Sequence, residues 1–218
     1  MIKKGFIFDL DGVIVDTAKY HFLAWRNLAN SLGIDFTEKE NEQLKGVSRV
    51  KSLEKILQWG NKTLSEDEFM ENMARKNQEY LSYINKMDDS EILPDVPKIL
   101  NYLVESKQPI SLGSASKNAR AILKKVNLFD TFDAIVDGTN VSKAKPDPEV
   151  FLNAAKELKM NPEDCIVFED SVAGVQAANN ANMISIGIGE ASVLHEADYV
   201  FKDFTEISTE FIQQLIEK

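Results

Sequence analysis

Hydrophobic and polar positions follow two different patterns along the chain. Residues 5–8 form a short apolar run, which predicts a buried strand at the start. Between residues 17 and 85 the apolar positions recur every three or four residues, which predicts four successive helices and no strand. From residue 93 onward, short apolar runs alternate with helical patterns. The chain therefore opens with one strand, passes through a helical segment and then alternates between strand and helix.

The alternating part predicts a parallel sheet. Further strands are expected, with helices between them, near residues 109–113, 134–136, 165–168, 184–188 and 199–201. Such alternation builds right-handed βαβ units with helices on both faces of the sheet. Because the first strand belongs to the same sheet, we expect a discontinuous α/β core with a Rossmann-like, doubly wound parallel sheet. Residues 1–15 and 91–218 would form this core, and residues 16–90 an inserted α-helical cap.

Local signals mark where two of the cap helices begin. Ser48 is placed to cap a helix that runs to Trp59, because a serine hydroxyl can accept a hydrogen bond from a free amide of the first turn. Ser65, followed three residues later by Glu68, is a capping box at the start of the longest predicted helix. These signals support a helical module inserted after the first strand.

Composition and charge exclude some classes of function. The 218 residues are 44% hydrophobic, enough for a buried core in one or two domains. The formal net charge of −10 argues against nucleic-acid or acidic-membrane partners. The single cysteine, Cys165, excludes an intrachain disulfide. With no signal-peptide pattern and no apolar stretch of membrane-spanning length, we expect a cytoplasmic monomer.

Two carboxylates follow the first strand. Asp9 and Asp11 are two residues apart, so an extended chain puts them on one side, at the sheet edge where open α/β folds bind ligands. A cation would relieve their repulsion, and oxygen-only ligands suit magnesium. One carboxylate could attack phosphorus while the other moves a proton. The alternative is a polar turn after a strand.

Three more groups of polar residues are expected at the same edge. Residues 114–118 offer hydroxyls and free amides for a phosphate, although serines there could merely cap a helix. Lys145 could neutralise a phosphate or a nucleophilic carboxylate, or simply be solvated. Glu169 and Asp170 leave a buried strand and would need a cation or hydrogen bonds, although Asp170 could cap the next helix. Their coincidence at one sheet edge favours an active site.

These residues resemble the four motifs of the haloacid-dehalogenase-like (HAD) phosphotransferase superfamily in order and spacing, over essentially the whole chain. The motifs are Asp9-x-Asp11-Gly12-Val13, Ser114, Lys145-Pro146 and Glu169-Asp170-Ser171-x-x-Gly174. The resemblance implies that Asp9 is the nucleophile and Asp11 the general acid/base. It also implies one Mg²⁺, held by Asp9, the backbone carbonyl of Asp11 and Asp170, with Glu169 nearby. Ser114 and Lys145 would bind the transferring phosphoryl group.

Within that superfamily the chain is most similar to the β-phosphoglucomutase family. The residues that carry the similarity are Thr17, His21, Trp25, Lys45, Gly46, Val47, Ser48, Arg49, Ser52, Lys76, Ala115, Ser116, Lys117 and Asn118. The resemblance adds Thr17, His21 and Lys45 to the catalytic residues, the last two beside Asp11. It assigns Arg49 to a second, distal phosphate, and the other residues to the sugar, the substrate or closure of the cap.

The resemblance implies a magnesium-dependent mutase that interconverts β-glucose 1-phosphate and glucose 6-phosphate through phospho-Asp9 and a bisphosphate. A phosphatase for sugar phosphates or phosphoglycolate would use the same core residues and is the nearest alternative. A non-catalytic sugar-phosphate sensor is a third, but it would be expected to lack Asp9 or Asp11. Two cap residues also have simpler interpretations, since His21 could be a core histidine and Arg49 a solvated surface charge.

Overall fold

The computed structural model describes residues 3–218. Its strands and helices are, in chain order, β1 (Gly5–Phe8), α1 (Ala18–Ser31), α2 (Glu38–Glu42), α3 (Arg49–Trp59), α4 (Glu66–Ile84), α5 (Val96–Glu105), β2 (Ile110–Gly113), α6 (Ala119–Lys125), β3 (Ala134–Val136), α7 (Glu149–Leu158), β4 (Cys165–Glu169), α8 (Val172–Asn180), β5 (Ile184–Ile188), β6 (Tyr199–Phe201) and α9 (Thr209–Glu217). No helix within this described part is both long and apolar enough to cross a bilayer.

The strands form one parallel sheet with the order β3-β2-β1-β4-β5-β6. The first strand of the chain is central, because β2 pairs with one of its edges and β4 with the other. Phe8, its last residue, is level with Leu112 and Phe168 in those neighbours. The predicted α/β fold with a doubly wound parallel sheet is therefore confirmed. Because the strands are parallel, the carboxyl ends of β1, β2 and β4 lie at the same end of the sheet.

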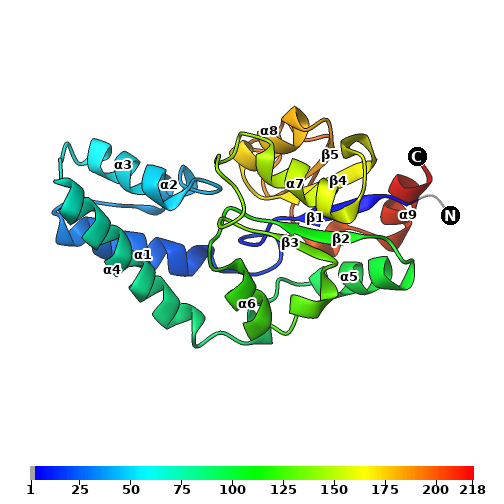
Figure 1. Ribbon diagram of the computed structural model, residues 1–218, viewed down its shortest axis with the longest axis horizontal. Helices are drawn as coiled ribbons and strands as arrows, with labels where there is room; N and C mark the ends of the chain where they lie inside the picture. The colour runs from blue at the N-terminus through cyan, green and yellow to red at the C-terminus, as the bar shows by residue number, and fades with distance from the viewer. Residues whose placement is uncertain (1–2) are drawn as a thin grey trace.

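Helices cover both faces of the sheet, with α7 and α8 on one and α5, α6 and α9 on the other (Figure 1). Side chains along β1 point alternately to the two faces of the sheet, so this strand contributes to the core on each face. Phe6 and Phe8 belong to one core cluster and Ile7 to the other. The ring of Phe8 stacks on that of Phe168, with centroids 4.5 Å apart. This packing holds β1 and β4 in register, and with them the carboxylates that follow each strand.

The helical segment α1–α4 lies at one end of the molecule, beside the sheet (Figure 1). It has a small core of its own that includes Trp25, Leu53 and Ile56. Ala24 of α1 and Tyr80 and Ile84 of α4 belong instead to the larger core cluster that includes the sheet. The helical segment is thus anchored to the sheet through α1 and α4.

Two neighbouring stretches link the helical segment to the sheet. Val15 forms an antiparallel bridge with Ile92, and the Asp16 amide donates to the Glu91 carbonyl over 2.9 Å. The predicted boundaries at 15/16 and 90/91 fall within this paired stretch. The division into two domains stays a prediction.

The two predicted helix caps are both present. The Ser48 hydroxyl accepts from the Lys51 amide over 3.4 Å, and Ser65 with Glu68 forms the capping box. A helix from Lys117 is also predicted by the apolar spacing that follows β2, but this start is wrong, because α6 begins at Ala119. The hydroxyls of Ser114 and Ser116 accept from amides two residues later and hold the chain in turns before the helix.

Candidate active site

A cavity of about 900 Å³ lies between the helical segment and the carboxyl ends of the central strands. The predicted site residues that line it are Asp9, Asp11, His21, Trp25, Lys45, Gly46, Val47, Ser48, Arg49, Ser52, Lys76, Ser114, Ala115, Ser116, Lys117, Asn118, Lys145 and Asp170. Two predicted residues, Thr17 and Glu169, lie behind this lining. Each is hydrogen bonded to a lining residue, Thr17 to Asp11 and Glu169 to Lys145.

Asp9 follows β1 directly, and its buried carboxylate meets Lys145 from the loop before α7. Lys145 Nζ lies 2.7 Å from Asp9 Oδ1 and 2.5 Å from Glu169 Oε1. Burial raises the pKa of Asp9 to about 7, against the lowering effect of the Lys145 charge. Burial alone would lower the pKa of Lys145, but the two carboxylates outweigh it and raise that pKa. Lys145 is therefore a buried cation beside Asp9, placed to balance added negative charge.

Glu169 ends β4 and has both carboxylate oxygens engaged. Oε1 accepts from Lys145, and Oε2 accepts from the Ser171 amide and hydroxyl at 2.8 and 2.9 Å. The carboxylate lies against the start of α8, where a Cβ on Gly174 would be 1.9 Å from it. These contacts favour a role for Glu169 in positioning Lys145, and direct contact between Glu169 and a metal stays a prediction.

Asp11 is held between the stretch that leaves β1 and the cap helices α1 and α4. The Thr17 hydroxyl donates to Asp11 Oδ1, and His21 Nε2 lies 3.9 Å from the same oxygen. Lys76 Nζ lies 2.9 Å from His21 Nδ1. Burial and the Lys76 and Arg49 charges hold the pKa of His21 well below its usual value, so the ring is neutral. While Lys76 is protonated it can only donate, so Nδ1 accepts and the Nε2 proton faces Asp11.

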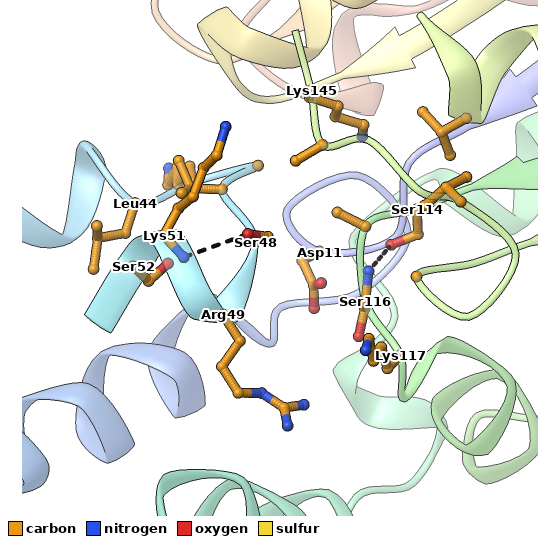
Figure 2. Close-up of a pocket in the computed structure, with 18 of the residues that line it drawn as sticks. Asp11, Leu44, Ser48, Arg49, Lys51, Ser52, Ser114, Ser116, Lys117 and Lys145 are labelled. Carbon is orange, nitrogen blue, oxygen red and sulfur yellow. Dashed lines mark hydrogen bonds between the residues drawn. The ribbon is translucent and has the colours of Figure 1, made fainter. Parts of the chain in front are cut away.

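Residues 114–118 form the wall that follows β2. Ser114 is buried at 1% exposure, and its hydroxyl accepts from the Ser116 amide over 3.2 Å (Figure 2). Capping of a helix is therefore not the role of these serines, because both of their hydroxyls serve turns. Asn118 ends the wall and donates to Asn77 of α4 over 3.2 Å, which joins it to the helical segment.

Arg49 begins α3, and its side chain extends into the space between α3 and the loop with Ser116 and Lys117 (Figure 2). Burial lowers the pKa of Arg49 from its usual value. Arg49 is half-buried and lines the cavity, and its assignment to a phosphate instead of to solvent stays a prediction. His21 likewise lines the cavity instead of lying within the core.

The loop between α2 and α3 touches the opposite wall. Lys45 Nζ lies 3.7 Å from Asp170 Oδ2, and a Cβ on Gly46 would be 2.6 Å from the Ser171 hydroxyl oxygen. Asp170 does not cap α8, because Ser171 is the N-cap and its hydroxyl accepts from the Gly174 amide over 3.1 Å. The Asp170 carboxylate is consequently available to the cavity.

The oxygen ligands near Asp9 fit a magnesium ion. Within residues 3–218 no three His, Cys, Asp or Glu side chains converge as a metal cluster, but the predicted set needs only Asp9, Asp170 and the Asp11 carbonyl. Asp170 lies so close to the loop after β1 that a Cβ on Gly12 would be 2.2 Å from its Oδ2. Burial, and then the Glu169 charge, raises the pKa of Asp170 well above its usual value. A divalent cation would offset this crowding, and its preferred ligands are hard oxygens.

Several residues at or beside the cavity were not among the predicted site residues, among them Asn41, Lys51, Ser142 and Asp147 of its lining. Two more lie on α4. These are Asn77 and Tyr80, one and four residues after Lys76, and both contact predicted site residues. Their helical spacing from Lys76 was visible in the sequence, but it is equally typical of residues that only pack. Only the fold shows which groups they meet.

The parallel sheet and the carboxylates at its edge define a family. The chain belongs to the haloacid dehalogenase-like hydrolases, which it matches over residues 3–182. Among its relatives is the beta-phosphoglucomutase of Bacillus subtilis, 41% identical over 213 residues that cover 97% of this chain and 94% of that protein. A crystal structure of beta-phosphoglucomutase from Clostridium difficile has a TM-score of 0.94 at 43% identity, covering 99% of this chain and 97% of that one.

A relative of different activity is also similar. The phosphorylated carbohydrates phosphatase of Thermotoga maritima is 32% identical over 185 residues, covering 83% of this chain and 82% of that protein. The family thus includes both phosphoryl transfer between sugar positions and hydrolysis.

Proposed function

We propose that this chain is a magnesium-dependent β-phosphoglucomutase that interconverts β-glucose 1-phosphate and glucose 6-phosphate. The observation that carries the proposal is the distribution of cations around the cavity. Lys145 lies beside Asp9 on the sheet side, while Arg49 lines the cap side of the same space. A bisphosphate needs a cationic site at each end, and a chain with a net charge of −10 must supply both locally. The near full-length similarity to two β-phosphoglucomutases supports the same assignment.

Asp9 carries the phosphoryl group in this proposal. Its carboxylate attacks the phosphorus of a sugar phosphate, the bond between phosphorus and the sugar oxygen breaks, and phospho-Asp9 forms. In the reverse sense, a sugar hydroxyl attacks phospho-Asp9 and regenerates the carboxylate. Lys145 and the Ser114 hydroxyl would hold the phosphoryl oxygens, the lysine as a charge and the serine as a donor.

Asp11 moves the proton that each transfer requires. It takes the proton from the attacking sugar hydroxyl and returns it to the departing sugar oxygen. Thr17 and His21 place this carboxylate, since Thr17 donates to Asp11 Oδ1 and the His21 Nε2 proton faces that oxygen.

The mutase cycle needs the intermediate to bind in two orientations. β-Glucose 1-phosphate receives the phosphoryl group at its other end, and the resulting bisphosphate turns end for end before it returns the first phosphate to Asp9. Arg49 would bind the phosphate that is not reacting, because a guanidinium can pair with two phosphate oxygens, and Lys117 would contact the substrate from the core side. The cavity of about 900 Å³ leaves room for this change of orientation.

Magnesium would be held by Asp9, Asp170 and the Asp11 carbonyl, where it would neutralise charge on the transferring phosphoryl group. The contacts of Lys45 and Gly46 with residues 170 and 171 close the cavity beside this position. Exclusion of water there favours transfer to a sugar over hydrolysis of phospho-Asp9. A monomeric state and a cytoplasmic location complete the proposal.

The test is to incubate the protein with β-glucose 1-phosphate, Mg²⁺ and a trace of glucose 1,6-bisphosphate. Glucose 6-phosphate and free phosphate are then followed together. Formation of glucose 6-phosphate that stops on addition of EDTA supports the proposal. Release of free phosphate without glucose 6-phosphate would favour a sugar-phosphate phosphatase, which the Thermotoga maritima relative makes the second candidate.

A further inference from the structure

Lys145 lies in a loop that has no strand or helix of its own. Residues 137–148 join β3 to α7 through turns and bends. Lys145 is nevertheless buried, and its Nζ lies 2.7 Å from Asp9 Oδ1 and 2.5 Å from Glu169 Oε1. Loops without regular backbone hydrogen bonding are the more mobile parts of proteins. Other contacts must therefore fix the backbone from which Lys145 projects.

The carboxylate of Glu149 fixes the backbone just before Lys145. Glu149 is the first residue of α7, and both of its carboxylate oxygens lie 3.0 Å from the amide nitrogen of Ser142. Its Oε2 also accepts from the Lys143 amide over 2.7 Å and from the Ser142 hydroxyl over 2.9 Å. The hydrogen bonds from the Ser142 and Lys143 amides lower the pKa of Glu149, so the group is ionised at neutral pH. One carboxylate thus holds two successive backbone amides and a hydroxyl.

These contacts do not belong to the start of α7. A carboxylate in the first turn of a helix is ordinarily favoured by the free amides of that helix. Within residues 3–218 the hydrogen bonds to the Glu149 carboxylate come from Ser142 and Lys143 instead. Asp147 serves the helix, because its Oδ1 accepts from the Glu149 amide over 3.1 Å. The Glu149 carboxylate therefore shapes the loop and not the helix.

The backbone after Lys145 is held independently. Asn180, the last residue of α8, donates from Nδ2 to the Pro146 carbonyl oxygen over 3.0 Å. The ring of Phe151 on α7 lies beneath the ammonium, with its centroid 4.8 Å from Lys145 Nζ. Lys145 thus lies between one fixed point at residues 142–143 and another at Pro146.

We propose that Glu149 is a positioning residue for Lys145, because it holds the loop backbone so that the Lys145 ammonium meets Asp9 and the phosphoryl group transferred there. The inference rests on the proposed function, in which Lys145 binds that group. A displacement of about 1 Å at an active site can lower a rate by about a hundredfold. Without the Glu149 contacts Lys145 is still attracted to Asp9 and Glu169, so the expected loss is smaller than that.

Three substitutions of Glu149 separate its hydrogen bonds from its charge. Glu149→Ala removes both. Glu149→Asp keeps the charge but is one methylene too short to reach residues 142 and 143. Glu149→Gln removes the charge and keeps an oxygen that can accept from both amides. We expect the kcat for glucose 6-phosphate formation to fall about fivefold to fiftyfold in the Ala and Asp variants and to stay within about threefold in Gln, with KM within about threefold throughout.

Urea unfolding curves, recorded beside the rates, show that each variant is folded under the assay conditions. A role limited to anchoring α7 predicts a lower urea midpoint with an unchanged kcat, so a kcat of Glu149→Ala within about twofold of the parent overturns the inference. A loss in Glu149→Gln without a loss in Glu149→Asp would mean that the charge matters and the hydrogen bonds do not, and this result also overturns it.

Glu157→Ala is the matched control. It removes an exposed glutamate from the other end of the same helix. This variant should keep the parent's kcat, because Glu157 lies far along α7 from the loop that carries Lys145.

Hydrolysis of acetyl phosphate separates the two proposals. Lys145 faces Asp9 whichever compound supplies the phosphoryl group, so the variants should lose this activity in the same order. A parent protein that hydrolyses acetyl phosphate but forms no glucose 6-phosphate disproves the mutase assignment. The acetyl phosphate rates of the parent and the Glu149 variants then decide the inference about Glu149, with the same limits.

Discussion

At the residue scale, the chemistry depends on how each buried carboxylate is balanced. Asp9 meets Lys145 at 2.7 Å, and Asp170 meets Lys45 at 3.7 Å. Both carboxylates are buried near further acidic groups, and the pKa of each is raised. A single change of charge here should therefore alter function more than a change on the surface.

Asp9→Asn is expected to abolish phosphoryl transfer while the fold remains intact. The amide has nearly the same shape, but it cannot attack phosphorus, and Lys145 keeps its contact with Glu169. The measurements are the rate of glucose 6-phosphate formation and the urea unfolding curve, with the exposed Asp130→Asn as control. Activity within tenfold of the parent, roughly 1.4 kcal/mol of barrier, would contradict the assignment of Asp9 as nucleophile.

Lys76 should make stability depend on pH. Burial, then the Arg49 charge, lowers the pKa of Lys76 from its ordinary 10.5 to about 7 in the folded chain. Above pH 7 the unfolded chain still binds this proton and the folded chain does not, so the free energy of unfolding rises with pH up to about 10.5. Between pH 6 and 9 the parent should gain about 2–3 kcal/mol relative to Lys76→Met.

Urea unfolding at pH 6 and pH 9 measures this difference. Lys62→Met changes an exposed lysine of the same helical segment and should keep the parent's dependence on pH. Parallel stability changes in the parent and Lys76→Met would show that Lys76 keeps its charge throughout the range.

At the element scale, helix starts and helix turns deliver groups to the cavity. The Ser48 cap ends the loop at α3 and makes Arg49 the first residue of the helix, where the free amides also favour anions. The 19 residues of α4 carry Lys76 and Tyr80 one turn apart on the side that faces α1. A short change in either helix would move several site residues together.

Arg49→Ala should weaken the mutase reaction selectively. Loss of a charge-assisted contact with the distal phosphate removes on the order of 1.5–3 kcal/mol, so kcat/KM should fall about tenfold to a hundredfold. Hydrolysis of acetyl phosphate, which has no second phosphate, should be spared. Lys62→Ala, at an exposed lysine shortly after the same helix, is the control. Equal losses in both assays would mean that Arg49 supports closure of the cavity and not phosphate recognition.

At the scale of the whole molecule, the helical segment and the sheet meet across the cavity at separate points. Lys45 approaches Asp170, Gly46 packs against Ser171, and Asn118 donates to Asn77. These contacts lie on two sides of the substrate space. They bring the cap cations over Asp9 only while the two parts remain together.

Gly46→Ala should disturb the contact between the helical segment and the start of α8. Gly46 has a φ of +70°, and an added Cβ would lie 2.6 Å from the Ser171 hydroxyl oxygen. Mutase kcat/KM should fall at least tenfold, and the share of free phosphate among the products should rise as water enters.

Gly33→Ala is the control for backbone strain alone. Gly33 has a φ of +71°, and no atom lies within 4 Å of the added Cβ. Both variants should lose stability of about 1–2 kcal/mol from the left-handed backbone. Only Gly46→Ala should change the ratio of products, and the same change in Gly33→Ala would point to general loosening of the helical segment.

The sequence by itself determined the elements and the edge at which the motifs meet. Strand periodicity and helix caps are local properties, so the sheet, the Ser48 cap and the Ser65 capping box were all predicted. Because parallel strands end at one edge, the residues after β1, β2 and β4 had to converge. The structure places them around one cavity, and their individual roles stay predictions.

Only the tertiary structure decided which groups face one another across that cavity. Helical spacing puts Lys76 and Tyr80 on one side of α4, but it does not say that His21 lies against both. Nor does it show that Ser171 instead of Asp170 caps α8. These contacts depend on how the helical segment packs over the sheet, and such packing joins residues that are distant in the chain, which local patterns cannot pair.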